Sequence, residues 1–189
     1  MRPLLLAALA LALCGPAAAA GPEPRGCGRH GAAPSADAAA RPLPALSGRV
    51  VDLANLFSAA EERRLAGIGE SLEAATTDQL VVVTLPSLAG ESIEAVGLRL
   101  GNGWGIGREG LDNGVLLIVA PRERRVRIEV ACGLEGLLTD ERAQAIVDGI
   151  VPLFAAGRFA DGARAGARAI ASILMSDRRR PRPWTGTAS

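Results

Sequence analysis

The sequence of 189 residues has no tyrosine, a single histidine and few aromatic residues, and all of its basic residues are arginine. After the first twenty positions no apolar run approaches the roughly 20 residues that a membrane-spanning helix needs. We therefore expect no transmembrane helix in the mature chain. The sequence also lacks a nucleophile elbow, a Cys/His pair, zinc-ligand spacing and a phosphate loop. Any hydrolytic chemistry would have to use a metal ion and carboxylates.

An excess of charge of one sign is also absent. The chain has 21 basic and 20 acidic residues. Removal of Arg2 with an N-terminal signal would leave 20 against 20, so the mature chain would be formally neutral. This balance argues against a general nucleic-acid binder.

The first twenty residues have the layout of a cleavable secretory signal. Arg2 precedes an apolar stretch over residues 4–13, and small residues follow at 17–20. We expect cleavage near Gly21 and no lipid anchor at Cys14. The mature protein should then be soluble and extracytoplasmic, either periplasmic or secreted.

Composition divides the remaining chain into three parts. Residues 21–46 are rich in Ala, Pro and Gly and hold almost no large apolar side chain, so they are predicted to be a disordered linker. Residues 47–175 are long enough for one domain with a single core. Residues 176–189 form a basic tail that is also predicted to be disordered.

Signal cleavage would leave two cysteines in a compartment that permits disulfides. Cys27 lies in the linker, whereas Cys132 continues the inward-facing alternation of residues 126–130. The preferred interpretation is a small buried thiol at Cys132 and a separate thiol at Cys27, with a disulfide between them as the alternative.

Local patterns predict a small mixed sheet layered with helices, and so the α/β class. Ser58 and Glu61 form a capping box at the start of one helix, and Ser92 and Thr139 are suited to cap two others. A last helix is expected to pack residues 159–174. The apolar runs 79–85 and 114–120 are typical of strands buried on both faces, and 124–132 alternates as a half-exposed strand.

The connections between these strands fix their directions. Residues 121–123 are too few for a crossover, so the last two strands should form an antiparallel hairpin. The strands at 79–85 and 114–120 are joined through a helix and should therefore be parallel.

Two glycine-rich loops bracket the predicted hairpin. Hairpin residues equally far from the turn lie opposite each other, so Asp112 and Asn113 should approach Glu135. Asp140 opens a helix beside them. Oxygen ligands of this kind suit a hard divalent cation. The candidate metal ligands are Asp112, Asn113, Glu135, Asp140 and, on a short first strand, Asp52.

The same residues also suit purely structural roles. Asp-Asn-Gly at 112–114 favours a turn, and Asp140 fits the first turn of a helix because of the helix dipole. Glu135 fits a solvated surface position. The loops are therefore either a metal or ligand site or a structural feature only.

Several short motifs follow one another in a specific order and spacing: Gly48–Asp52, Trp104–Gly107, Asp112–Leu116, Gly133–Gly136, Leu138–Asp140 and Pro152–Phe154 with Gly157. This order resembles the TPM domain family, which includes thylakoid-lumen phosphatase-like, photosystem-repair and bacterial extracytoplasmic proteins. Two features depart from the family pattern. Ala131-Cys132 stands where the pattern usually reads Gly-Tyr, and no membrane helix or glycine-rich tail follows the domain.

The resemblance implies a three-layer α/β/α sandwich and divalent-metal binding, with calcium as the ion. It also implies weak acid-phosphatase activity, as in some plant members, and roles beside membrane complexes, as in others. The leading interpretation is a metal-binding accessory module for membrane or envelope protein complexes. The alternatives are a metal-dependent acid phosphatase that hydrolyses phosphomonoesters, or a domain whose loops are inert. No organic cofactor and no nucleic-acid partner are expected.

Overall fold

The computed structural model describes residues 42–176. In chain order the elements are β1 (Val50–Asp52), α2 (Ala59–Thr76), β2 (Gln79–Thr84), α3 (Ile93–Trp104), β3 (Gly114–Ala120), β4 (Arg125–Val130), the 3-10 helix η1 (Cys132–Leu134), α4 (Asp140–Ala155) and α5 (Phe159–Ser176). The expected signal segment, most of the expected linker and the basic tail after Ser176 lie outside the described residues.

The four strands lie side by side in the order β1-β2-β3-β4. β1 with β2, and β2 with β3, are parallel, whereas β3 and β4 are antiparallel. All residues of β3 are buried, because this central strand has neighbours on both edges and helices on both faces. The structure therefore confirms the predicted parallel pair, the predicted hairpin and the α/β class.

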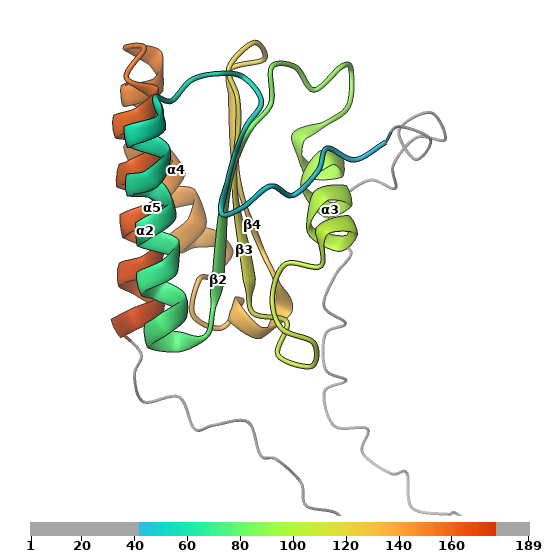
Figure 1. Ribbon diagram of the computed structural model, residues 1–189, viewed down its shortest axis with the longest axis vertical. Helices are drawn as coiled ribbons and strands as arrows, with labels where there is room; N and C mark the ends of the chain where they lie inside the picture. The colour runs from blue at the N-terminus through green and yellow to red at the C-terminus, as the bar shows by residue number, and fades with distance from the viewer. Residues whose placement is uncertain (1–41, 177–189) are drawn as a thin grey trace, which may run out of the picture.

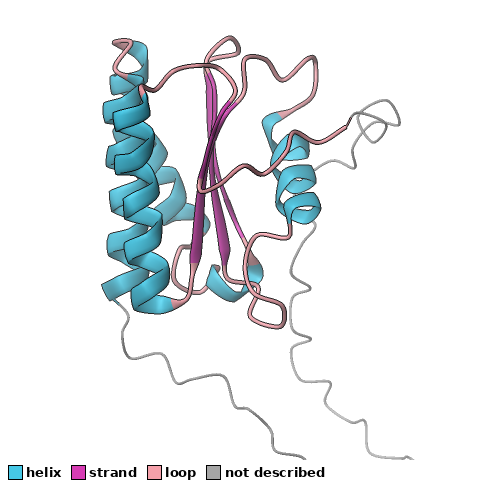
Figure 2. Cartoon of the chain, in the orientation of Figure 1, coloured by secondary structure: helices cyan, strands magenta, loops and turns pink. Residues whose placement is uncertain are grey.

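Alternate residues of the central strands face two separate apolar clusters, as the two-residue period of a strand requires. Leu80 and Val82 pack with residues of α2, α4 and α5, whereas Val81 and Val83 pack with residues of α3. Figure 1 shows these helices on the two sides of the sheet, and Figure 2 shows the strands between them. The three-layer sandwich is thus confirmed.

Three helices begin directly after the capping residues that the sequence predicted. Ser58 and Glu61 form the complete capping box of α2. Ser92 Oγ accepts from the Ala95 backbone amide at the start of α3, at 3.1 Å. Thr139 Oγ1 accepts from the Arg142 backbone amide at the start of α4, at 3.4 Å. Within residues 42–176, no helix is long and apolar enough to cross a membrane.

Packing begins slightly before Ser47, where the domain was expected to start. Leu43 packs against the cluster under α3, and the indole Nε1 of Trp104 donates to the Pro44 carbonyl oxygen at 2.8 Å. A Cβ at Gly103 would lie 2.0 Å from Leu43 Cδ1, so the Leu43 side chain packs directly on the α3 backbone at this glycine. The sequence gives no sign of this contact, because one leucine among Pro and Ala has no periodicity.

Candidate functional site

The two glycine-rich loops meet at one end of the sheet, where β3 begins and β4 ends. Val115 pairs with Val130, and the Ala131 amide donates to the Gly114 carbonyl oxygen at 2.9 Å. One step further, the Gly133 amide donates to the Asp112 carbonyl oxygen, also at 2.9 Å. The hairpin register therefore brings the two loops into contact, as predicted.

Gly133 allows this contact, because its backbone packs directly on the other loop. A Cβ at this position would lie 2.0 Å from the Leu111 carbonyl oxygen and 2.9 Å from that of Asp112. Asp112 itself has a φ of 45°, in the left-handed region that aspartate and asparagine tolerate better than most residues. Gly133 in one loop and Asp112 in the other therefore suit the backbone conformations that bring the two loops together.

A cleft of about 520 Å³ lies beside the two loops. Its walls come from the last turns of α3, from residues 105–112, and from the end of β4 with η1. The charged residues that line it are Arg108, Glu109, Asp112, Glu129 and Glu135. Glu129 is paired with Arg127, whose Nε lies 2.6 Å from Glu129 Oε2. Acidic groups therefore outnumber basic ones around the cleft.

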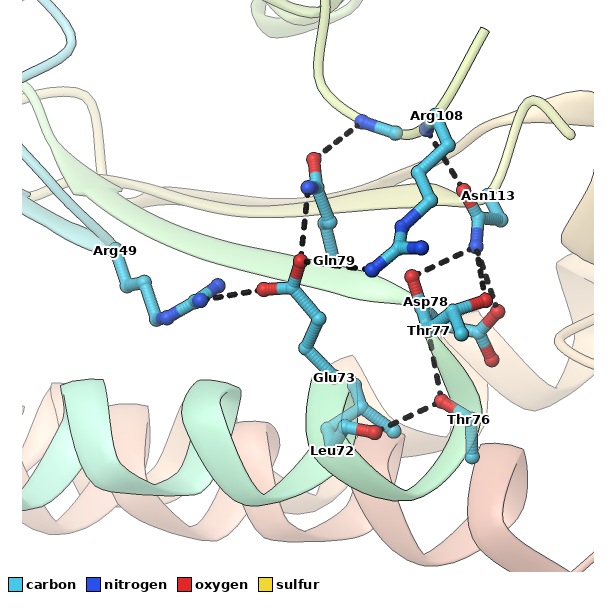
Figure 3. A network of polar contacts seen from close by, with 10 residues as sticks. Arg49, Leu72, Glu73, Thr76, Thr77, Asp78, Gln79, Arg108 and Asn113 are labelled. Carbon is cyan, nitrogen blue, oxygen red and sulfur yellow. Dashed lines mark hydrogen bonds and ion pairs between the residues drawn. The ribbon is translucent and has the colours of Figure 1, made fainter. Parts of the chain in front are cut away.

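Asn113 points away from the cleft into the protein, with only 2% of its surface exposed. Its Oδ1 accepts from the Arg108 backbone amide at 2.8 Å. Its Nδ2 donates to the Thr77 carbonyl oxygen at 2.9 Å and to Asp78 Oδ1 at 3.1 Å (Figure 3). The side-chain amide thus ties the loop after α2 to the loop before β3, and its oxygen is already used.

A second polar network joins α2 to the same loop (Figure 3). Gln79 Nε2 donates to Glu73 Oε1 at 3.1 Å, and Gln79 Oε1 accepts from the Gly107 amide at 2.9 Å. Glu73 also forms an ion pair with Arg49. The hydrogen bond from Gln79, helped by Arg49 and Arg108 and opposed by burial, lowers the pKa of Glu73. The sequence offered one sign of this network, a glutamine at the start of an apolar strand.

Asp52 lies at the opposite end of the sheet. It pairs with Thr84 at the end of β2, whereas Gln79 at the start of β2 is next to the Asn113 loop. The six residues of β2 separate the two ends by roughly 17 Å. The Asp52 carboxylate accepts from the amides of Leu56 and Phe57, at 3.1 and 2.8 Å, and so holds its own loop. It cannot share an ion with Asp112.

Asp140 is the exposed first residue of α4 and does not line the cleft. In the part of the chain that the structure describes, no group of three or more His, Cys, Asp or Glu side chains is placed to hold a metal ion. Of the five candidate ligands, the structure brings Asp112 and Glu135 to one cleft. The other three candidates do not line this cleft. The side chains of Asn113 and Asp52 form hydrogen bonds that hold loops of the domain, and Asp140 is exposed at the start of α4.

Cys132 also lines the cleft, and it is disulfide-bonded. The interpretation of Cys132 as a buried thiol is therefore wrong. The alternation of β4 ends at Val130, because the chain turns into η1, and this leaves Cys132 partly exposed. The two other cysteines, Cys14 and Cys27, lie outside the described residues.

A mixed four-stranded sheet between helical layers, with a cleft at one end of a hairpin, defines a small α/β/α domain. The family model described as the TPM domain matches residues 50–173. The chain belongs to the TPM domain family, as the order of its motifs predicted. No curated protein sequence matches the chain.

Solved structures with this fold come from several bacteria. The N-terminal domain of a protein from P. gingivalis is 34% identical, with a TM-score of 0.65, and the match covers 70% of this chain and 85% of that one. The N-terminal domain of the cg2496 protein from Corynebacterium glutamicum is 19% identical, with a TM-score of 0.57 and coverage of 72% and 86%. The BA42 protein from the psychrophilic bacterium Bizionia argentinensis is 20% identical, with a TM-score of 0.56 and coverage of 64% and 82%. The last two support the fold alone.

Proposed function

We propose that this protein is an extracytoplasmic accessory module that docks on membrane or envelope protein complexes. Its cleft binds a divalent cation, and the proposed ion is calcium. The observation that carries the proposal is the position of Asp112 and Glu135. Both line one cleft, on two loops joined by the Gly133 to Asp112 hydrogen bond.

The chemistry of this ligand set fits a weak calcium site. Calcium takes about 6–8 oxygen ligands, so two carboxylates leave most positions to backbone carbonyls and water. Sites of this kind in extracellular modules have dissociation constants on the order of 10⁻⁴–10⁻³ M. Arg108 at the same cleft would weaken binding further by repulsion. We therefore expect an exchangeable ion and not a permanent structural one.

Two observations support the extracytoplasmic location. The first twenty residues have the layout of a secretory signal. Cys132 is disulfide-bonded, and such bonds persist in oxidising compartments and are rare in the cytosol.

Thermal denaturation with and without calcium tests the proposal. At a calcium concentration ten times the dissociation constant, a site present only in the folded state adds about 1.4 kcal/mol to the free energy of unfolding. Magnesium at the same ionic strength serves as the comparison ion. Absence of any shift with calcium, magnesium or manganese would contradict the proposal.

Two conservative variants locate the site. Asp112→Asn removes the charge and keeps a residue that tolerates the left-handed backbone, which alanine would not. Glu135→Gln removes the second charge without a change of size. Both should abolish the calcium shift. The matched control is Glu70→Gln, an exposed acid on α2 across the sheet, which should leave the shift intact.

One observation favours a second candidate function, a metal-dependent phosphomonoesterase. Arg108 lines the cleft among the carboxylates with half of its side chain exposed, and a guanidinium is well suited to hold a phosphoryl group. A bound metal ion would polarise the phosphoryl oxygen. If this candidate is correct, the wild type must hydrolyse a phosphomonoester, and both chelation and Arg108→Gln must reduce the rate. If the protein is an accessory module only, the wild type should not hydrolyse the phosphomonoester.

A further inference from the structure

Arginines gather at the tip of the β3–β4 hairpin, at the end of these strands away from the cleft (Figure 1). Arg122 and Arg124 lie in the turn, Arg125 is the first residue of β4, and all three are exposed. Arg127, further along β4, is instead paired with Glu129. Among the residues that the structure describes, no acid forms a salt bridge with any of the three exposed arginines. Their charge is therefore open to solvent.

Two acids close to this tip are turned inward. Glu123 lies in the turn itself, but its Oε1 accepts from Ser87 Oγ at 2.8 Å and from the Leu88 amide at 3.0 Å, and its Oε2 is buried. Glu91, at the end of the same neighbouring loop, forms an ion pair with Arg99 at 2.9 Å and exposes only 8% of its side chain. The tip therefore presents arginines outward and keeps these carboxylates beneath its surface.

The basic tip is opposite in sign to the rest of the domain. Residues 47–175 hold 17 acids against 13 arginines, and acids outnumber basic residues around the cleft. The seven residues of β3 separate the tip from the cleft by roughly 23 Å. This separation is about three times the Debye length of roughly 8 Å at physiological salt. The acidic cleft therefore does not cancel the charge of the tip, and an anionic surface would attract one end of the domain only.

We propose that the hairpin tip, defined by Arg122, Arg124 and Arg125, docks the domain on a bilayer of anionic phospholipids, with the cleft facing away from the bilayer. Guanidinium groups bind phosphate oxygens through paired hydrogen bonds. Lipid headgroups move within the bilayer, so they can gather around separate arginines without a shaped pocket. An acidic protein would have to match this turn with a fixed surface of its own. The proposal rests on the docking part of the proposed function and not on the cation site.

Cosedimentation of the mature chain with vesicles tests the docking. Vesicles that contain phosphatidylglycerol are compared with vesicles of phosphatidylcholine alone, in EDTA. Each arginine near an anionic surface contributes about five-fold to binding, so the double variant Arg122→Gln, Arg125→Gln should bind about 25-fold more weakly. Arg124 is kept, because its φ of 54° lies in the left-handed region. The control Arg142→Gln, Arg168→Gln removes the same charge from exposed positions on α4 and α5, and it should bind within about three-fold of wild type.

Three results would overturn the proposal. They are equal binding to the two kinds of vesicle, an equal loss in the two variants, and no binding to anionic vesicles. The last result would leave docking to proteins, which the proposed function also includes. Arginines outside the described residues are the same in both variants, so their contribution cancels in the comparison. The calcium shift in Tm is measured without lipid, so failure of the cation site and failure of the docking tip are distinguishable.

Paramagnetic headgroups in anionic nanodiscs test the orientation on the unmodified protein. Amide signals of residues 121–125 and 87–90 should broaden, whereas those of residues 105–112 and 133–136 at the cleft should keep their intensity. Broadening that centres on the cleft, or that is equal at both ends of β3, would overturn the proposal even if the protein binds anionic vesicles.

Discussion

Replacement of Asn113 by alanine should lower the free energy of unfolding by about 3 kcal/mol. The Asn113 amide is buried and holds the Arg108 backbone amide on one side and the Thr77 carbonyl oxygen and Asp78 on the other. Truncation leaves these groups without that partner, at a cost of about 1–3 kcal/mol for each one that stays dry. Water can reach part of this loop, so we take a value in the lower part of the summed range.

Chemical denaturation of wild type and Asn113→Ala measures this difference directly. A loss of about 3 kcal/mol corresponds to a fall in Tm of about 10 °C for a domain of this size. Asn102→Ala is the matched control, because Asn102 is an exposed helical residue at the same cleft. It should change stability by less than about 0.7 kcal/mol, in the stabilising direction, since alanine is the better helix former. An Asn113→Ala variant within about 1 kcal/mol of wild type would refute the reasoning.

Three further predictions concern the glycine contact, the Glu73 network and the tail. Gly133→Ala should force the two loops apart, lowering Tm and abolishing the calcium shift, whereas Gly136→Ala, where a Cβ meets nothing within 4 Å, should do neither. The pKa of Glu73 is lowered, chiefly by the hydrogen bond from Gln79. The ionised Glu73 carboxylate therefore stabilises the fold at pH values above its ordinary pKa of 4.5, and this stabilisation is lost as the pH falls further. Acid titrations of stability should therefore be shallower below about pH 4.5 in Glu73→Gln than in wild type. Truncation after Ser176 should leave Tm nearly unchanged, and a large fall would show that the tail belongs to the domain.

The fold was predictable because its signals are local and agree with one another. Ser58, Ser92 and Thr139 begin helices through hydrogen bonds to amides three residues ahead. The three-residue connection at 121–123 fixes the hairpin, and the hairpin register alone places Asp112 beside Gly133. The position of the cleft therefore follows from the sequence.

The roles of individual side chains at the site were less predictable. Asn113 was a candidate ligand by residue type, but a turn sequence does not reveal that its amide points inward to Thr77 and Asp78. Asp52 belongs to the far end of the sheet, which only the pairing of β1 with β2 shows.

Cys132 illustrates a different limit of sequence reasoning. Its spacing continues the alternation of β4, but the hydrogen-bonded strand ends at Val130, and the spacing alone does not show where the chain turns. The Glu73–Gln79 contact joins the last part of α2 to the first residue of β2, and Gln79 in turn accepts from the Gly107 amide in the loop after α3. No sequence periodicity indicates these contacts.

A calcium titration followed by amide NMR shifts, residue by residue, tests the central claim most directly. The account predicts saturable shifts at Asp112, Gly133 and Glu135, with much smaller changes at Asp52 and at the exposed Asp148 on α4. The shifts should be absent from the Asp112→Asn variant. Shifts that never saturate and spread evenly over exposed acids, or that centre on Asp52, would contradict a cation site in the cleft.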